Sequence, residues 1–196
     1  MNKKLLNAVK NGYKETVSIL LENGANVNAK TKHGTTALMC ASEYGYKETV
    51  SILLENGAHV NAKDTYYGIT ALMEASEYGH TQTVALLLEK RAHVNVKDNH
   101  GKTALIKASE YGHTQTVALL LEKGANVNAK WLYGGTALME ASKKGHKDIV
   151  TLIKNHITRM VCLVIKKGRT KSQNPIPLVR HSHKDIAYCI ALYVTE

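Results

Sequence analysis

The sequence predicts an all-α solenoid of about five helix-turn-helix repeats, followed by a C-terminal tail that does not repeat. The first observation is a period of 33 or 34 residues, because the string Ala-Ser-x-x-Gly opens at Ala41, Ala75, Ala108 and Ala141. A fixed period of this length is typical of architectures in which neighbouring repeats bury one another's apolar faces. The second observation is the composition: the 196 residues include no Phe and only two Pro. Aliphatic residues and Ala must therefore fill a core of closely packed helices.

Each copy predicts a short first helix and a second helix separated by glycine. A threonine that can cap the first helix precedes it in four copies, at Thr36, Thr70, Thr103 and Thr136. The separating glycines are residues 45, 79, 112 and 145. The second helix carries apolar residues at helical spacing, as in Val50, Leu53 and Leu54.

The end of the second helix also has a sequence signature. Gly24, Gly57 and Gly124 stand where a left-handed residue closes a helix. The third copy has Arg91 there, which predicts a cost of about 1 kcal/mol if the conformation is kept. The string Ala-Asn-Val-Asn-Ala-Lys that follows is expected to be extended, with side chains alternating inward and outward.

The repeats share the consensus Gly-x-Thr-Ala-Leu-Met-x-Ala-Ser-x-x-Gly-His-x-x-x-Val-x-Leu-Leu-Leu-Glu-x-Gly-Ala-x-Val-Asn-Ala. With this consensus, residues 5 to about 153 resemble the ankyrin repeat. The chain departs from that family where Thr-Ala-Leu-Met replaces Thr-Pro-Leu-His. It also has one extra residue between Lys63 and Gly68, which predicts a bulge. The resemblance implies a repeat domain over 1–156, with repeats near 1–30, 31–63, 64–97, 98–130 and 131–156, and a basic tail over 157–196.

The tail leaves two interpretations open. Apolar positions 149, 153, 157, 160 and 164 fit a second helix that extends to Gly168, whereas residues 161–165 also fit a strand. We favour the helix, because it would cover the exposed face of the last repeat. Residues 168–180 are interpreted as a basic loop, and the string from Ser182 to Asp185 as a capping box before a short final helix.

The charge and the cysteine content of the chain limit the classes of function and the compartments that it fits. The net charge is +10, of which residues 155–196 supply +5, so the body is mixed in charge and the tail is basic. This unevenness disfavours a nucleic-acid binder, whose basicity would be more uniform. The three cysteines form no Cys-x-x-Cys pair, which fits a reducing compartment, and we expect the cytoplasm. We expect no secretory signal and no membrane span, since no apolar run reaches about 18 residues.

The residues give no support for an enzyme. No nucleophile with its base, phosphate-binding loop or paired-carboxylate cleft is found, so we expect no catalytic residues and no cofactor. His181 and His183 form a His-x-His pair, but only Cys162 and Cys189 are candidates to complete a zinc site, so we expect no metal. His80, His113 and His146, which follow the inter-helix glycines, are interpreted as structural.

In the ankyrin family partners bind the fingertips and the concave face of the first helices, so the resemblance implies a partner-binding surface. Aromatic residues on exposed tips favour binding hot spots. The predicted set is His33, Tyr44, Tyr66, Tyr67, Ile69, Glu74, Tyr78, His100, Lys102, Lys107, Tyr111, Trp131, Leu132, Tyr133 and Glu140.

Two alternatives stay open within this set. Trp131 either anchors a partner or packs on the tail or a neighbouring finger. Tyr44, Tyr78 and Tyr111 are either a binding ladder or a structural feature copied with each repeat. The inner position of the first helix varies among Cys40, Glu74, Lys107 and Glu140, as a selectable surface would.

We therefore predict a monomeric, non-enzymatic scaffold that binds a protein partner. The alternative is an adaptor, or an effector secreted by a bacterium into a host cell, whose tail recruits a second partner. The basic run 166–171 is interpreted as a solvated turn or as a nuclear or phosphate-binding segment. The resemblance also implies that Asn28, Asn61, Asn95 and Asn128 can be hydroxylated by an asparaginyl hydroxylase.

Overall fold

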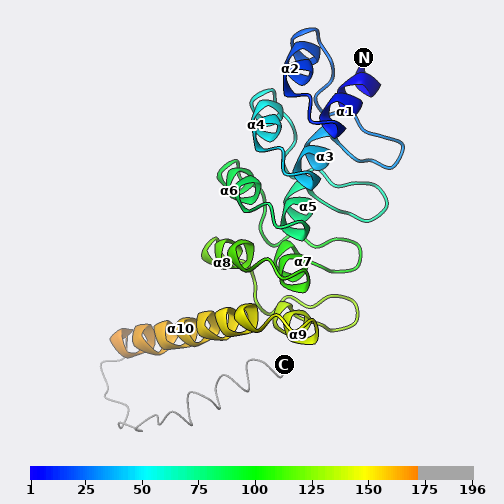
Figure 1. The fold of residues 1–196 in the computed structure, drawn as a ribbon. Helices are drawn as coiled ribbons and strands as arrows, with labels where there is room; N and C mark the ends of the chain where they lie inside the picture. Colours follow the sequence, from blue (N-terminus) through cyan, green and yellow to red (C-terminus); the bar gives the residue numbers. More distant parts are fainter. Residues whose placement is uncertain (172–196) are drawn as a thin grey trace.

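The computed structural model describes residues 1–171, and the side chains of residues 1–162. In this part of the chain ten helices form five pairs, which stack side by side into an all-α solenoid (Figure 1). The first helices lie in one row and are α1 (Asn2–Lys10), α3 (Ala37–Glu43), α5 (Ala71–Glu77), α7 (Ala104–Glu110) and α9 (Ala137–Lys143). The second helices lie in another row and are α2 (Lys14–Glu22), α4 (Lys47–Glu55), α6 (Thr81–Glu89), α8 (Thr114–Glu122) and α10 (Lys147–Lys171). The connecting fingers project from the side of the first helices away from the second helices (Figure 1).

The core runs the length of the stack instead of collecting at one centre. The first helices bury residues such as Leu72 and Met73 in α5, and the second helices bury residues such as Val84 and Leu87 in α6. Because these side chains meet residues of the neighbouring pairs, they join one continuous cluster from Leu5 to Ile157. The observation agrees with stacking as the source of stability, since one pair alone would leave a face exposed.

The predicted threonine caps are confirmed. Each hydroxyl accepts a hydrogen bond from the backbone N–H three residues later, as at Thr36, where the oxygen lies 3.3 Å from the nitrogen of Met39. The same bond is made by Thr70, Thr103 and Thr136. The family's proline is missing from these helix starts, and the hydroxyl satisfies one of the free N–H groups there.

The last helix is much longer than the others. Helix α10 is continuous from Lys147 to Lys171, and it passes Lys154, where the repeat pattern ends in the sequence. The strand interpretation of residues 161–165 is therefore wrong, and the helix interpretation is correct, although the helix continues three residues beyond Gly168. The proposed boundary after residue 156 falls inside α10. The rest of the basic loop, the capping box and the final helix lie outside the described residues.

The second finger contains the predicted insertion, but the segment that leads into the fingers is not extended as expected. The Ala-Asn-Val-Asn-Ala segment is not extended, because a turn closes on a hydrogen bond from the Ala29 N–H to the Asn26 carbonyl. The extra residue is visible in the second finger, where the Asp64 N–H reaches the carbonyl of Ile69, five residues on. In the third finger the equivalent bond joins Asp98 to Lys102, only four residues on. The insertion therefore lengthens the loop, as predicted.

Histidine and asparagine side chains connect neighbouring pairs of helices, and both act at the two middle junctions of the stack. The His113 ring contacts the Glu77 carbonyl through Nε2 at 2.8 Å, and His80 and His146 make the same contact one repeat away on either side. The Asn61 side chain accepts from the N–H of His93 and donates to the carbonyl of Arg91, both in the next repeat. The structural interpretation of the three histidines is confirmed, since each ring satisfies a helix-end carbonyl of the preceding repeat.

The inter-helix glycines provide a test of this stacking. A Cβ added at Gly112 would lie 2.7 Å from Cε1 of His146, whereas a Cβ at Gly145 would meet nothing within 4 Å. Both residues have positive φ, 85° and 78°. We expect Gly145→Ala to cost about 1 kcal/mol for the left-handed conformation. Gly112→Ala should cost roughly 1–3 kcal/mol more, because the imidazole must move. Urea unfolding measures both, and equal losses would contradict the packing role of His146.

Arg91 keeps the left-handed conformation that glycine adopts in the other repeats. Its φ is 66°, close to the 84° of Gly57 and the 83° of Gly124, and it is the one non-glycine residue with positive φ in residues 1–171. Its side chain is exposed, and the bond that it accepts from Asn61 goes to its backbone carbonyl. A glycine could therefore replace it without loss of that contact.

We predict that Arg91→Gly raises the free energy of unfolding by about 0.5–1 kcal/mol. The gain from removing the left-handed strain exceeds the entropy that glycine adds to the unfolded chain. The matched control is Lys90→Gly, since Lys90 has φ −84° and gains nothing from glycine. Chemical denaturation of the three proteins checks this, and a less stable Arg91→Gly variant would show that the arginine contributes a contact of its own.

Candidate functional site

The four fingers are held together by backbone hydrogen bonds. The Thr65 N–H donates to the carbonyl of His33 at 3.0 Å, and the Asn99 N–H to that of Tyr67 at 2.7 Å. The next finger follows the same rule, with the Leu132 N–H on the His100 carbonyl at 2.8 Å. Consecutive fingers thus form one linked surface, so a partner would meet a preformed platform instead of four independent loops.

Aromatic side chains gather along this platform. The rings of His33 and Tyr66 lie 5.1 Å apart across the first two fingers, and those of Tyr67 and His100 lie 6.3 Å apart across the next two. The last finger exposes 68% of Leu132 and 82% of Tyr133. Large apolar side chains with this exposure are the residues that partners of a protein bury.

A groove lies between the fingers and the first helices of the second to fourth repeats. Its volume is about 500 Å³. Its walls combine aromatic rings, carboxylates and two lysines. The lining residues are Glu43, Tyr67, Ile69, Glu74, Glu77, Tyr78, Asp98, His100, Lys102, Lys107 and Trp131. We call this hollow the groove.

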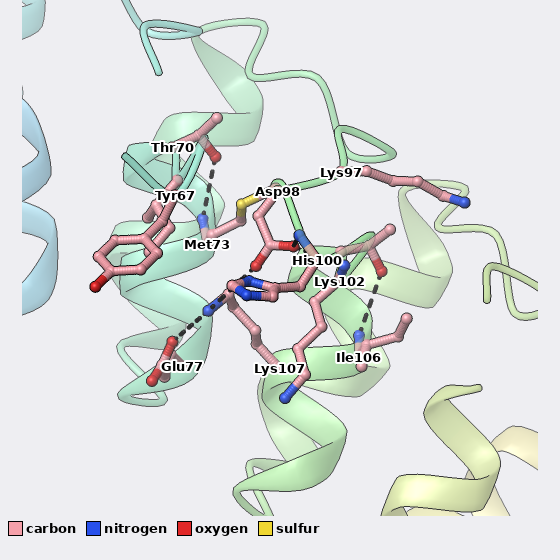
Figure 2. A network of polar contacts seen from close by, with 12 residues as sticks. Tyr67, Thr70, Met73, Glu77, Lys97, Asp98, His100, Lys102, Ile106 and Lys107 are labelled. Carbon is pink, nitrogen blue, oxygen red and sulfur yellow. Dashed lines mark hydrogen bonds and ion pairs between the residues drawn. The ribbon is translucent and has the colours of Figure 1, made fainter. Parts of the chain in front are cut away.

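Ion pairs between repeats connect the floor of the groove. Figure 2 shows Lys107 of α7 reaching Glu77 of α5, where the Nζ–Oε2 distance is 2.7 Å. The same ammonium lies 3.8 Å from Asp98. Burial lowers the pKa of Lys107, but the hydrogen bond and charge of Glu77, with the charge of Asp98, raise it overall, so the side chain stays charged. Asp98 also accepts from the N–H groups of His100 and Lys102, which fixes the third finger.

Glu74 differs from these paired carboxylates. No Lys, Arg or His nitrogen of the described chain lies within ion-pair distance of it or of Glu43. Burial, followed by the charges of Glu43 and Glu77, raises the Glu74 pKa from 4.5 to about 7, although Lys107 opposes the shift. At neutral pH the groove therefore holds a carboxylate that is only partly ionised and lacks a cation of its own.

Contacts of the Trp131 side chain hold the fourth finger in place. The Trp131 indole donates to Glu140 at 3.0 Å, and the Lys102 ammonium lies 4.8 Å from the centre of the indole ring. Lys102 also pairs with Glu110 at 2.5 Å. Trp131 is half-buried, so it packs on the neighbouring finger and lines the groove instead of forming an exposed tip. The exposed tip belongs to Leu132 and Tyr133.

The three repeated tyrosines cap the C-terminal ends of the first helices α3, α5 and α7, and each residue is 40–53% exposed. Their stacking partners are local: Tyr44 stacks on Tyr46, and Tyr78 on His80. Of the three, Tyr78 lines the groove. Tyr44 and Tyr78 therefore stack on residues of their own repeats and not on one another.

The structure brings together the middle of the predicted set and leaves its ends apart. Eight predicted residues line the groove, namely Tyr67, Ile69, Glu74, Tyr78, His100, Lys102, Lys107 and Trp131. Lys107 and Glu140 are buried and engaged in internal pairs, so they shape the surface instead of presenting charge on it. Sequence reasoning missed Glu43, Glu77 and Asp98. The Glu-Tyr-Gly string in each of three repeats is a signal that could have located the first two.

Two further properties of the described chain bear on the class of site. Within residues 1–171, no three His, Cys, Asp or Glu side chains come together to hold a metal ion. None of the helices in that range has the length and apolar character needed to cross a membrane. The His-x-His pair at 181 and 183 and Cys189 lie outside the described residues.

A family model for ankyrin repeats (3 copies) matches residues 3–64, 63–131 and 97–161. These matches cover well over half of the chain, so the protein belongs to the ankyrin repeat family. Ankyrin repeats are generally protein–protein interaction modules, and proteins built from them are generally non-catalytic scaffolds. A comparison with curated proteins found no match.

The raised pKa of Glu74 predicts a pH-dependent cost in stability. The folded-state pKa is about 7 and the ordinary value is 4.5, so between these values the folded protein binds more protons than the unfolded chain. Stability contributed by this group is therefore lost as pH rises from 4.5 through 7. We expect Glu74→Gln to be more stable than the wild type at pH 8 by roughly 1–3 kcal/mol, and by little at pH 4.5. Denaturation at the two pH values checks this, and a pH-independent difference would contradict it.

Proposed function

We propose that this protein is a non-enzymatic scaffold that binds a protein partner through its fingertips and the concave face of its first helices. The observation that carries the proposal is the groove, which joins aromatic fingertips to a charged floor within one backbone-linked platform. A large exposed apolar surface beside fixed polar groups is the composition expected of an interface with a protein.

The linkage of the fingers supports tight binding without a large entropy cost. Three inter-finger backbone bonds hold the loops, and Lys63 and Lys97 each donate from Nζ to a carbonyl of the next finger, at 2.7 and 3.1 Å. Less conformational freedom is lost on binding when the loops are already ordered. The partner would bury Tyr67 and Tyr78 in the groove and Leu132 and Tyr133 at its edge.

Affinity capture with matched variants tests this proposal. We expect a partner captured by the wild type to bind a Tyr67→Ala/Tyr78→Ala/Tyr133→Ala variant at least 100-fold more weakly, because loss of aromatic anchors costs several kcal/mol. Tyr13→Ala/Ile19→Ala is the control, since these exposed residues lie on the second-helix side, at α2 and the residue before it. Isothermal titration with the captured protein gives the affinities. Unchanged binding by the triple variant would place the interface elsewhere.

A second partner at the tail is favoured by the length and charge of α10. This helix has 25 residues, whereas the other second helices have nine. Within α10 the sequence has seven Lys or Arg and one acid, Asp148. A basic helix that continues past the repeat pattern could recruit an acidic partner, as the adaptor alternative requires. Changing Lys166, Lys167, Arg169 and Lys171 to Ser should remove that partner and keep the partner of the groove.

A further inference from the structure

We propose that the groove binds a basic segment of the protein partner, with a lysine or arginine side chain seated beside Glu74 and Glu43 and against the rings of Tyr67 and Tyr78. This inference rests on the proposed function, because it names the chemistry of the partner that the groove would take. It follows from the charges and the aromatic rings of the groove together.

The charges of the groove are not balanced. Its walls hold four carboxylates and two lysines, although the chain as a whole has a net charge of +10. Both lysines are already paired, Lys107 with Glu77 and Asp98, and Lys102 with Glu110. The two carboxylates that remain are Glu43 and Glu74, for which the described residues supply no ion-pair partner. A cation brought by the partner would pair with these two carboxylates, as Lys107 pairs with Glu77 and Asp98 within the protein.

Successive repeats show which kind of side chain pairs with the glutamate near the end of the first helix. Cys40, Glu74, Lys107 and Glu140 occupy the same place in four successive first helices. In the fourth repeat Lys107 reaches back to Glu77, which is the equivalent of Glu43 one repeat earlier. In the third repeat the residue that could reach back to Glu43 is Glu74, a second acid. The groove therefore lacks a basic group at the place where the next repeat has one.

The aromatic residues of the groove suit the same ligand. Tyr67 and Tyr78 line the groove and are 56% and 51% exposed, so a partner can reach their rings. A cation above an aromatic ring is attracted to its face, and the site already contains one example, in which the Lys102 ammonium sits 4.8 Å from the centre of the Trp131 ring. Carboxylates and open rings together favour an arginine or lysine over an apolar or acidic side chain.

A peptide-display selection separates this inference from the proposed function. A random 12-residue library is selected on the full chain and, in parallel, on Glu43→Gln/Glu74→Gln. The control is Glu48→Gln/Glu89→Gln, which removes two exposed glutamates of the outer helices α4 and α6. We expect peptides enriched in Lys and Arg from the wild type and the control, and loss of that enrichment from the groove variant.

The other outcomes are also decisive. Peptides that bind the groove but are apolar, acidic or unaffected by the loss of the two glutamates overturn the basic-segment inference and leave the scaffold proposal standing. Failure to select any peptide whose binding depends on Tyr67 and Tyr78 overturns both.

The pH dependence of a selected peptide gives a second readout. The groups that face Glu74 are Cys40 and Glu43 on α3, Asp64 in the second finger, Glu77 and Tyr78 on α5, and Lys107 on α7. Since a seated cation favours the ionised carboxylate, the peptide should bind about tenfold more tightly at pH 8 than at pH 6, and Glu74→Gln should remove most of this change. His100→Gln is the control, because it removes the histidine that lines the groove and leaves Glu74 in place. Equal affinity of the wild type at both pH values would overturn the inference.

Discussion

Stacking in register is the constraint on which the rest of this structure depends. Neighbouring helix pairs are held together by an imidazole on a helix-end carbonyl, by an asparagine side chain that bonds in both directions, or, at the two middle junctions, by both. The fingers continue the same register through backbone hydrogen bonds. Equivalent residues of successive repeats are therefore brought side by side, and the chemistry of the concave face is decided by which residues of neighbouring repeats the stacking brings into contact.

The groove follows directly from that rule. Where a residue of one first helix faces an oppositely charged residue of the preceding first helix, an ion pair closes the floor, as at Lys107 and Glu77. Where the facing residues are both acidic, as at Glu74 and Glu43, the register brings carboxylates together, and burial with the charges of Glu43 and Glu77 raises the Glu74 pKa. Such a cluster lowers the stability of the free protein, and proteins keep features of this kind where binding or catalysis uses them.

Much of the fold could be predicted from the sequence because its signals are local and repeated. Threonine caps, inter-helix glycines and the apolar spacing of the second helix each depend on a few neighbouring residues. The insertion in the second finger was also visible, since it changes the period at one place. The turn in the Ala-Asn-Val-Asn-Ala segment was missed, because alternating burial also occurs in a turn whose alanines face the core.

The site was less predictable, because its chemistry arises between repeats. Lys107 is buried in a pair with Glu77, and Glu140 is buried in a hydrogen bond with Trp131. The two members of each pair occupy different positions of the repeat, so no periodic pattern in the sequence connects them. The position of Trp131 in the repeat left open whether it anchors a partner or packs on a neighbour, and the structure places its ring beside the Lys102 ammonium. Exposure of Leu132 and Tyr133 agreed with expectation, since tips of fingers have few neighbours. Sequence reasoning thus located the surface, and the register of the stack determined its charge.

The most direct test of this account is a carboxyl ¹³C NMR titration of Glu74 in the full chain, with Glu74→Gln to assign the signal. If register forces unpaired carboxylates together in the groove, the Glu74 resonance will titrate with a midpoint of about 7. The midpoint should move to lower pH when a selected Lys/Arg peptide is bound. A midpoint near 4.5 in the free protein, unchanged by the peptide, would mean that the groove is not the electrostatically unsatisfied surface described here.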